Sequence, residues 1–135
     1  MDASAFADTN VLLCALSADP AKADKAEGLL RERMTISVQV LNEFASVARR
    51  KLSMSWEEIV DVLGLLRQRC VVRPLTLGVH DLGLSLVRRH RFAWYDALIV
   101  AAALDAGCAT LYSEDMQHGM RVGKSLRIVN PFAPT

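Results

Sequence analysis

The sequence has few of the residues that typify small secreted or zinc-binding proteins. It contains only three cysteines, which stand far apart in apolar segments and form no CxxC pair: Cys14, Cys70 and Cys108. We expect buried free thiols in a reducing compartment, because an odd and scattered set does not make a disulfide framework. The three histidines are equally dispersed, so a structural zinc site is not expected.

Long hydrophobic runs and targeting signals are lacking as well. The longest uncharged apolar run in the second half spans residues 97–104 and is closed by Asp96 and Asp105. It is much shorter than the ~20 residues that a membrane-spanning helix needs. Residues 1–6 include no basic residue, and Asp8 follows soon after, which argues against a signal peptide. We therefore predict a cytoplasmic protein with no membrane partner.

Neither sign of charge dominates. Sixteen Lys and Arg residues face fifteen Asp and Glu residues, which gives a formal net charge of +1. With 52% hydrophobic residues the chain is not disordered, and 135 residues suit a single domain, 1–135. The net charge indicates no partner; the placement of the charges is more informative.

Short apolar segments alternate with segments of helical period. We predict five strands, at residues 4–7, 35–37, 71–75, 109–112 and 126–129. Helices are predicted at residues 11–17, 20–33, 38–52, 55–69, 78–90 and 95–106. This alternation predicts an α/β fold, a parallel sheet covered by helices on both faces. In such folds ligands bind at the carboxyl ends of the strands.

Most of the acidic residues are explained as helix caps or solvated surface, and a few are not. Asp8 directly follows the first strand, although a helix N-cap would also explain it. Glu43 lies two helical turns beyond any capping position, at the border of an apolar face, where a surface Glu with a buried stem is the ordinary alternative.

Two further acidic positions need a partner or a function. Asp96 opens the most apolar helix and shares its face with Ile99 and Val100, although the helix dipole alone would favour an Asp there. The segment containing Ser113, Glu114 and Asp115 follows the fourth strand directly, where a polar turn is the ordinary alternative.

Together these acids are more informative than any one of them. Asp8 and Asp115 end strands, Asp96 begins a helix, and Glu43 lies on the helix that follows the second strand, so all four can meet at the carboxyl edge of one sheet. Clustered carboxylates repel one another, and no nearby Lys or Arg in the sequence offsets them. An all-oxygen anionic cluster favours Mg²⁺ or Mn²⁺ over zinc.

Four segments, in order, resemble the signature segments of PIN-domain nucleases. They are Asp8-Thr9-Asn10, the stretch from Ser37 through Val40 to Glu43-Phe44, Tyr95-Asp96-Ala97-Leu98-Ile99, and Ser113-Glu114-Asp115-Met116. The likeness covers essentially the whole chain. A stand-alone chain of this length is most similar to the VapC-type toxins of prokaryotic type II toxin–antitoxin pairs.

The resemblance implies a PIN-like α/β/α sandwich with a five-stranded parallel sheet and a Mg²⁺- or Mn²⁺-dependent endoribonuclease. It implies an acidic site of Asp8, Glu43, Asp96 and Asp115, each also a candidate metal ligand, with supporting roles for Asn10 and Ser113. Asp8 and Asp96 are then the principal ligands, whereas Glu43 orients or deprotonates the attacking water. The resemblance leaves Glu114 as the variable residue before the catalytic Asp115, with an assisting role open.

The resemblance also implies partners: an RNA substrate, a cognate antitoxin protein and a second copy in a homodimer. Apolar residues on the helices at 20–33 and 55–69 are candidates for these protein surfaces, although core packing explains them equally well. Five arginines are candidate RNA contacts, although their positions near helix C-termini suit the dipole as well: Arg49, Arg50, Arg88, Arg89 and Arg91. Trp94 and Tyr95 precede an apolar helix and are expected to pack in the core in preference to stacking on a base.

Other functions remain open at this point. A PIN-fold module that binds RNA or protein without catalysis, or a PIN nuclease of RNA processing without an antitoxin, would share these segments. A phosphoacceptor receiver domain also gathers acids at a sheet edge, but it needs a Lys after a late strand, and Lys124 precedes the fifth predicted strand. A haloacid-dehalogenase-type phosphatase needs D-x-D after its first strand, where this chain has Asn10.

Overall fold

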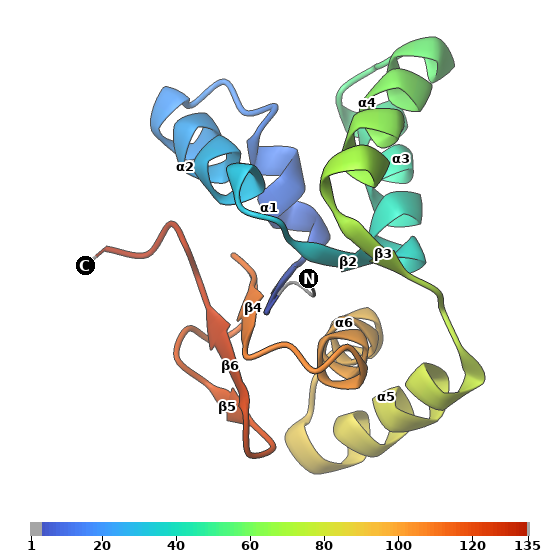
Figure 1. Ribbon diagram of the computed structural model, residues 1–135, viewed down its shortest axis with the longest axis vertical. Coiled ribbons are helices and arrows are strands. Elements are labelled where there is room, and N and C mark those ends of the chain that lie inside the picture. Colours follow the sequence, from blue (N-terminus) through green and yellow to red (C-terminus); the bar gives the residue numbers. More distant parts are fainter. Residues whose placement is uncertain (1–3, 135) are drawn as a thin grey trace.

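Six short strands form one sheet in the computed structural model, which describes residues 4–134 (Figure 1). Residues 1–3, part of the segment from which the lack of a signal peptide was predicted, lie outside this range. The strand order is β3-β2-β1-β4-β6-β5. The strands are β1 (Ala5–Ala7), β2 (Thr35–Ser37), β3 (Val71–Arg73), β4 (Thr110–Tyr112), β5 (Arg121–Val122) and β6 (Leu126–Val129).

The five predicted strands are all present, and they are mutually parallel. The sixth strand, β5, was not predicted; it pairs antiparallel with β6 at the sheet edge, with Val122 opposite Leu126. The predicted α/β class is therefore confirmed, and the sheet has six strands instead of five. The two residues of β5 are too few to show the alternation of apolar and polar residues that marks a strand, so only the hydrogen-bonded pairing with β6 defines it.

Six helices cover the sheet. They are α1 (Thr9–Cys14), α2 (Pro20–Arg31), α3 (Val38–Lys51), α4 (Trp56–Arg69), α5 (Leu77–His90) and α6 (Trp94–Asp105). In Figure 1, α1 to α4 lie above the strands, whereas α5 and α6 lie below β2 and β3 and to the right of β4, β6 and β5, so helices flank the sheet on both sides in an α/β/α sandwich. Within the described residues, no helix is both long enough and apolar enough to cross a membrane.

Local signals fix where the helices begin. The Asp19 carboxylate caps α2 by accepting from the Ala21 N–H, and Pro20 occupies its first position. Ser55 and Glu58 form a reciprocal capping box at the start of α4: the Glu58 N–H donates to the Ser55 hydroxyl at 3.1 Å, and the Ser55 N–H donates to the Glu58 carboxylate at 2.9 Å. Helix α1 begins two residues before the prediction because Asp8 caps it. Gly107 follows α6 with φ +73°, in the left-handed region that favours glycine after a helix.

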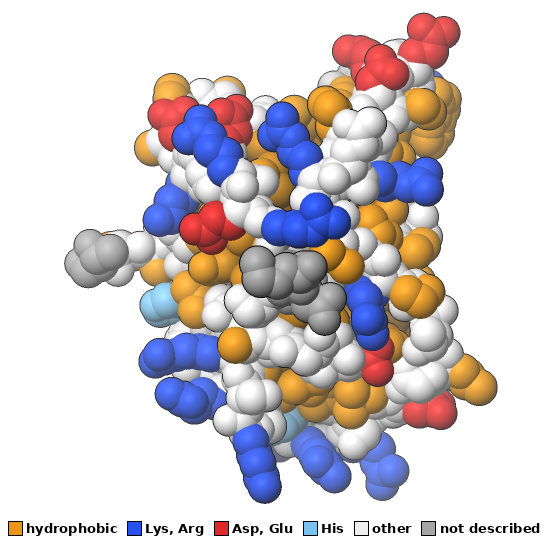
Figure 2. All heavy atoms as spheres, in the orientation of Figure 1, with side chains coloured by type: hydrophobic (Ala, Val, Ile, Leu, Met, Phe, Trp, Pro, Cys, Tyr) orange, Lys and Arg blue, Asp and Glu red, His pale blue; other side chains and the backbone are white. Residues whose placement is uncertain are grey.

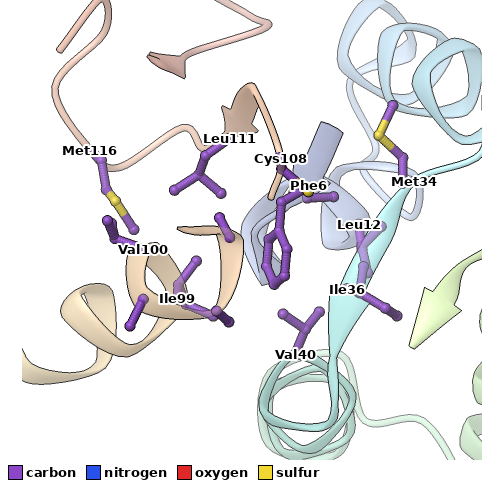
Figure 3. Close-up of a cluster of buried hydrophobic side chains, with 14 of the residues drawn as sticks. Phe6, Leu12, Met34, Ile36, Val40, Ile99, Val100, Cys108, Leu111 and Met116 are labelled. Atoms are coloured by element: carbon purple, nitrogen blue, oxygen red, sulfur yellow. The ribbon is translucent and has the colours of Figure 1, made fainter. Parts of the chain in front are cut away.

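The core lies on both sides of β1 (Figure 3). Phe6 on β1 and Ile36 on β2 are fully buried, in a group that includes Val40 of α3 and Ile99 of α6. Helix α6 is buried through most of its circumference, which explains its almost uniformly apolar sequence. All three cysteines are buried, as predicted, and none forms a disulfide within residues 4–134.

The chain changes direction between β1 and β4. It proceeds from β1 to β2 and β3 on one side, and then returns to place β4 on the other side of β1. The carboxyl ends of β1 and β4 therefore flank the switch point of the sheet, which is where ligands bind in open α/β folds. Asp8 follows β1 there, and Ser113 follows β4.

Candidate active site

Asp8 lies at the centre of the switch point. Its side chain is 5% exposed, and it accepts hydrogen bonds from the Thr9 N–H at 2.7 Å and from the Ser113 hydroxyl at 2.9 Å. Its own N–H donates to the Tyr112 carbonyl at 2.9 Å, which joins β1 to β4. Asp8 is thus both the helix cap and the most buried acid of the predicted site.

Burial raises the pKa of Asp8 to about 6, against the hydrogen bonds from Ser113 and Thr9, which lower it. The negative charges of Asp96 and Glu43 raise that pKa further. Three of the predicted acids are therefore close enough to influence one another's charge.

Asn10 connects Asp8 to the segment after β4. Its amide Nδ2 donates to Asp115 Oδ2 at 3.1 Å and to Asp8 Oδ2 at 3.4 Å. Its Oδ1 accepts from the Glu114 N–H at 3.0 Å. The two predicted supporting residues, Asn10 and Ser113, thus hold the carboxylates of Asp8 and Asp115 near each other at the sheet edge.

Glu43 is held by Gln39, a residue that the sequence did not single out. The buried Gln39 amide donates to Glu43 Oε1 at 2.7 Å and to the Tyr95 carbonyl at 3.3 Å. Gln39 therefore ties Glu43 of α3 to the residue that precedes Asp96 on α6. The available signal was the i, i+4 spacing from Gln39 to Glu43 on one helical face.

Asp96 is half-buried in the first turn of α6, whose N-cap residue Ala93 has no capping side chain. Burial raises the pKa of Asp96, and the carboxylates of Asp115 and Glu43 raise it further. The charges of Asp96 and Glu43 thus act on Asp8, and those of Asp115 and Glu43 act on Asp96, so these interactions link the four predicted acids, which come from the end of β1, from α3, from α6 and from the segment after β4.

Glu114 has a different partner from its neighbour Asp115. Its carboxylate pairs with the Lys22 ammonium of α2. Lys22 also lies 5.6 Å from the centre of the Phe132 ring. Lys22 was not predicted to have a role at the site. Over residues 4–134, no ion pair reaches Asp8, Glu43, Asp96 or Asp115, so their charges are not offset.

The donor atoms at the site suit a hard divalent cation in type, since all are oxygens of coupled carboxylates. Across the described part of the chain, however, no three His, Cys, Asp or Glu side chains are gathered closely enough to hold a metal ion together. This spacing still fits Mg²⁺, which commonly takes one or two protein carboxylates and keeps several waters.

Comparison with known proteins identifies the architecture. The family model described as the PIN domain matches residues 5–119, which include all four acids. The chain belongs to the PIN domain family. No curated protein sequence matches it significantly.

Two solved structures share the fold of this PIN domain. One is the toxin VapC20 of Mycobacterium tuberculosis, described as cleaving the sarcin–ricin loop, at 20% identity and a TM-score of 0.68, covering 83% of this chain and 90% of that one. The other is a toxin–antitoxin complex from Klebsiella pneumoniae, at 17% identity and a TM-score of 0.73, covering 96% and 98%. At these identities the likeness establishes the fold.

The candidate RNA contacts of the PIN domain differ in their surroundings. The Arg49 guanidinium donates to the Met54 carbonyl at 3.0 Å and stacks over Trp56, and Arg50 donates to the Ser46 hydroxyl at 3.1 Å. Arg88, Arg89 and Arg91 are exposed, and their side chains form no hydrogen bond or ion pair with residues 4–134.

The charged side chains are unevenly spread over the face of the molecule shown in Figure 2. Lys and Arg side chains line its lower edge, with few acidic side chains among them, and others are scattered over its upper half, where acidic side chains stand out at the tips of α2 and α4. The expectation for Tyr95 is wrong: its side chain is 64% exposed, whereas Trp94 is half-buried against His80.

Proposed function

We propose that this PIN domain is a metal-dependent endoribonuclease whose catalytic residues are Asp8, Glu43, Asp96 and Asp115. The observation that carries the proposal is the coupled set of four carboxylates at the switch point, with the pKa of Asp8 raised to about 6 and no ion pair to the set within the described residues. Uncompensated acids at the ligand-binding edge of a sheet are costly, and a divalent cation with its phosphate ligand offsets that cost.

Asp8 and Asp96 would hold Mg²⁺ or Mn²⁺ directly, with Asp115 acting through water or a second ion. When bound, the ion would polarise the scissile phosphate. It would also lower the pKa of a water molecule, which makes that water easier to deprotonate and a better nucleophile at neutral pH. Ser113 and Asn10 keep Asp8 and Asp115 turned toward the site through the hydrogen bonds described above.

Glu43 is the group that orients the attacking water. Because Gln39 donates to Oε1 of Glu43, the free Oε2 is the atom that accepts the water's proton. The water oxygen forms a bond to phosphorus, the P–O bond to the leaving ribose oxygen breaks, and that oxygen takes a proton from solvent, which leaves a phosphate monoester and a ribose hydroxyl. Gln39 thus serves as a positioning residue for Glu43.

We further infer that the chain is the toxin of a type II toxin–antitoxin pair. Both structural relatives support this inference: one is a toxin by its description, and the other is part of a toxin–antitoxin complex. A largely apolar hollow of about 490 Å³ between α1–α2 and α3–α4 supports a protein partner, either an antitoxin or a second copy. Its lining includes the exposed Leu16 and Leu65.

The nuclease proposal is tested by incubating the purified protein with structured RNAs in Mg²⁺, in Mn²⁺ and in EDTA. We expect site-specific cuts that require the metal and that Asp96→Asn abolishes, while the circular dichroism spectrum stays unchanged. Undiminished cleavage by Asp96→Asn would contradict the assignment of Asp96 as a catalytic residue. No cleavage, together with no metal binding by calorimetry, would favour a PIN-fold binding module. The genomic neighbourhood distinguishes a toxin from a nuclease of RNA processing. A small open reading frame just upstream, encoding a protein that binds this chain, would support the toxin.

A further inference from the structure

A hollow of about 460 Å³ opens beside the acid site, between α3, α5 and α6. Glu43 forms part of its wall, and Tyr95 on the opposite side directly precedes Asp96. The hollow therefore adjoins two of the four proposed catalytic acids. Its volume falls within the range of about 300–1,000 Å³ typical of small-molecule pockets.

The walls of this hollow suit a flat, uncharged group. Most of their exposed surface is apolar and includes Leu75, Leu98 and the exposed ring of Tyr95, while polar side chains complete the lining: Gln39, Asn42, Ser46, Thr76 and His80, with Glu43. Among the described residues, Glu43 is the only Asp, Glu, Lys or Arg in the lining, and Arg50 adjoins the hollow only through its hydrogen bond to the Ser46 hydroxyl. A phosphate placed there would meet the Glu43 carboxylate, whereas a nucleobase would meet apolar surface and an aromatic face.

The hollow also offers a free hydrogen-bonding group at its rim. Asn42 is exposed, and its amide forms no hydrogen bond with any residue from 4 to 134. The neighbouring amide of Gln39 is already engaged by Glu43 and Tyr95. A carboxamide pairs in two hydrogen bonds with the N6 and N7 edge of adenine, which makes adenine the base that Asn42 matches best.

The far wall is fixed in place. The His80 ring meets the Trp94 ring edge-on, with 5.5 Å between the centroids and 85° between the planes. Thr76 caps α5 by accepting from the Val79 N–H at 3.1 Å. A wall held by an aromatic contact and a helix cap is preorganised, which reduces the entropy lost when a ligand binds.

We propose that this hollow binds one nucleobase of the RNA, next to the bond that is cut, with Tyr95 stacking on the base and Asn42 reading its edge. The inference rests on the proposed endoribonuclease function, which places the scissile phosphate at the acids. Base and phosphate of one nucleotide are then held by adjoining parts of the same surface. The hollow selects where the RNA is cut.

Binding of short RNAs tests the proposal without cleavage. The background variant is Asp8→Asn, because Asp8 does not line the hollow. The probes are fluorescein-labelled hexauridine and the same RNA with one adenine, measured by fluorescence anisotropy in Mg²⁺. We expect the adenine RNA to bind about tenfold more tightly, which is the size of one bidentate contact. Asn42→Ala should remove this preference.

Tyr95 variants separate stacking from a merely structural effect. Tyr95→Ala should weaken binding of both RNAs about tenfold, the size of one stacked base, whereas Tyr95→Phe should retain it. Trp56→Ala is the matched control, because Trp56 is a similarly exposed aromatic residue outside the hollow and should leave binding unchanged.

Two results would overturn the inference: equal binding of the two RNAs by the background variant, or an adenine preference that survives Asn42→Ala. Cleavage by the protein with Asp8 intact is scored separately. If that protein cuts RNA, but the background variant shows no adenine preference or one that Asn42→Ala does not remove, the proposed nucleobase site is wrong and the nuclease proposal is retained. If it cuts no RNA in any metal, the nuclease proposal fails, whatever the binding assay shows.

Discussion

Asp8 shows a conflict between stability and function at a single residue. Its carboxylate is buried beside two other acids, so its pKa lies near 6 instead of 3.8. Between about pH 4 and 6 the folded state therefore holds a proton that the unfolded state has lost. Stability falls as pH rises through that window, and above it the full cost of the buried charge remains.

We predict that Asp8→Asn stabilises the metal-free protein while abolishing cleavage. Asn caps helices as well as Asp does, so α1 retains its cap, and the buried charge is removed. In EDTA the free energy of unfolding at pH 7.5 should rise by roughly 2 kcal/mol. This is the free energy that corresponds to the pKa shift of Asp8, reduced by some loss of hydrogen bonding when Asn replaces Asp. Urea titrations measure it.

The increase in the free energy of unfolding that Asp8→Asn causes should shrink toward zero near pH 4, where Asp8 is protonated in the folded state. The control is Asp115→Asn, because Asp115 is exposed and its charge is solvated. An equal gain for Asp8→Asn at both pH values would contradict burial of charge as the cause.

Glu114 and Asp115 are adjacent acids with different neighbours, and we predict different roles for them. Asp115 shares the Asn10 amide with Asp8, whereas Glu114 is paired with Lys22 on α2. Asp115→Asn should lower the rate of RNA cleavage by about 10–100-fold, as the loss of a group supporting a metal site does. Glu114→Gln should change it by less than about threefold, well below that range. Single-turnover cleavage of one RNA by both variants measures the difference.

Lys22 provides the check on this assignment. Lys22→Met leaves Glu114 without its partner and free to turn toward the other acids. If Glu114 normally takes no part, Glu114→Gln should restore whatever activity Lys22→Met loses. A double variant as inactive as Lys22→Met alone would speak against the separation of the two acids.

At the scale of elements, the contact between α5 and α6 depends on the absence of a side chain at Gly83. A Cβ there would lie 2.8 Å from Leu98 Cδ2 and 3.6 Å from the Trp94 ring. Gly64, on α4, has no heavy atom within 4 Å of the corresponding position. The two glycines have opposite packing environments within helices of equal length.

We predict that Gly64→Ala raises the free energy of unfolding by about 0.5–1 kcal/mol, since Ala favours the helix and little else changes. Gly83→Ala should lower it by roughly 1 kcal/mol, because displacing Leu98 outweighs the same helical gain. Chemical denaturation of both variants measures the difference. Stabilisation by both would show that Leu98 moves aside freely.

The sequence predicts the elements of this fold well where a local signal defines them. Ser55, Asp19 and Gly107 mark helix ends, and β2 and β6 have the predicted bounds. The strand β5 could not be predicted, because only its pairing with β6 makes Arg121–Val122 a strand. For the same reason Gln39 and Lys22 were missed at the site. Each acts through a contact between elements, and no spacing along the chain encodes such a contact.

At the scale of the whole molecule, a net charge of +1 conceals separate groups of charge. The four acids of the candidate site lie at the switch point of the sheet, whereas the lower edge of the face in Figure 2 is lined by Lys and Arg side chains with few acidic side chains among them. An RNA that reaches the acids must therefore be held by cations placed elsewhere. The structure divides the candidate arginines into two classes: Arg49 and Arg50 are engaged within the protein, and Arg88 and Arg89 are not.

We predict that the double variant Arg88→Ala/Arg89→Ala weakens RNA binding and makes it less sensitive to salt. Each lost phosphate contact removes about 0.7 from the slope of log K against log salt for a single strand, so two contacts should lower the slope by about 1.4. The matched double variant Arg49→Ala/Arg50→Ala should leave the slope nearly unchanged, although loss of the Arg49 contacts with Met54 and Trp56 should lower stability slightly. Anisotropy titrations from 50 to 200 mM salt, a range over which phosphate contacts change affinity strongly, measure both slopes.

Equal slopes for the parent and the Arg88/Arg89 variant would place the RNA backbone on another surface. The next residues to replace would then be the exposed cations along the β5–β6 edge: Arg121, Lys124 and Arg127.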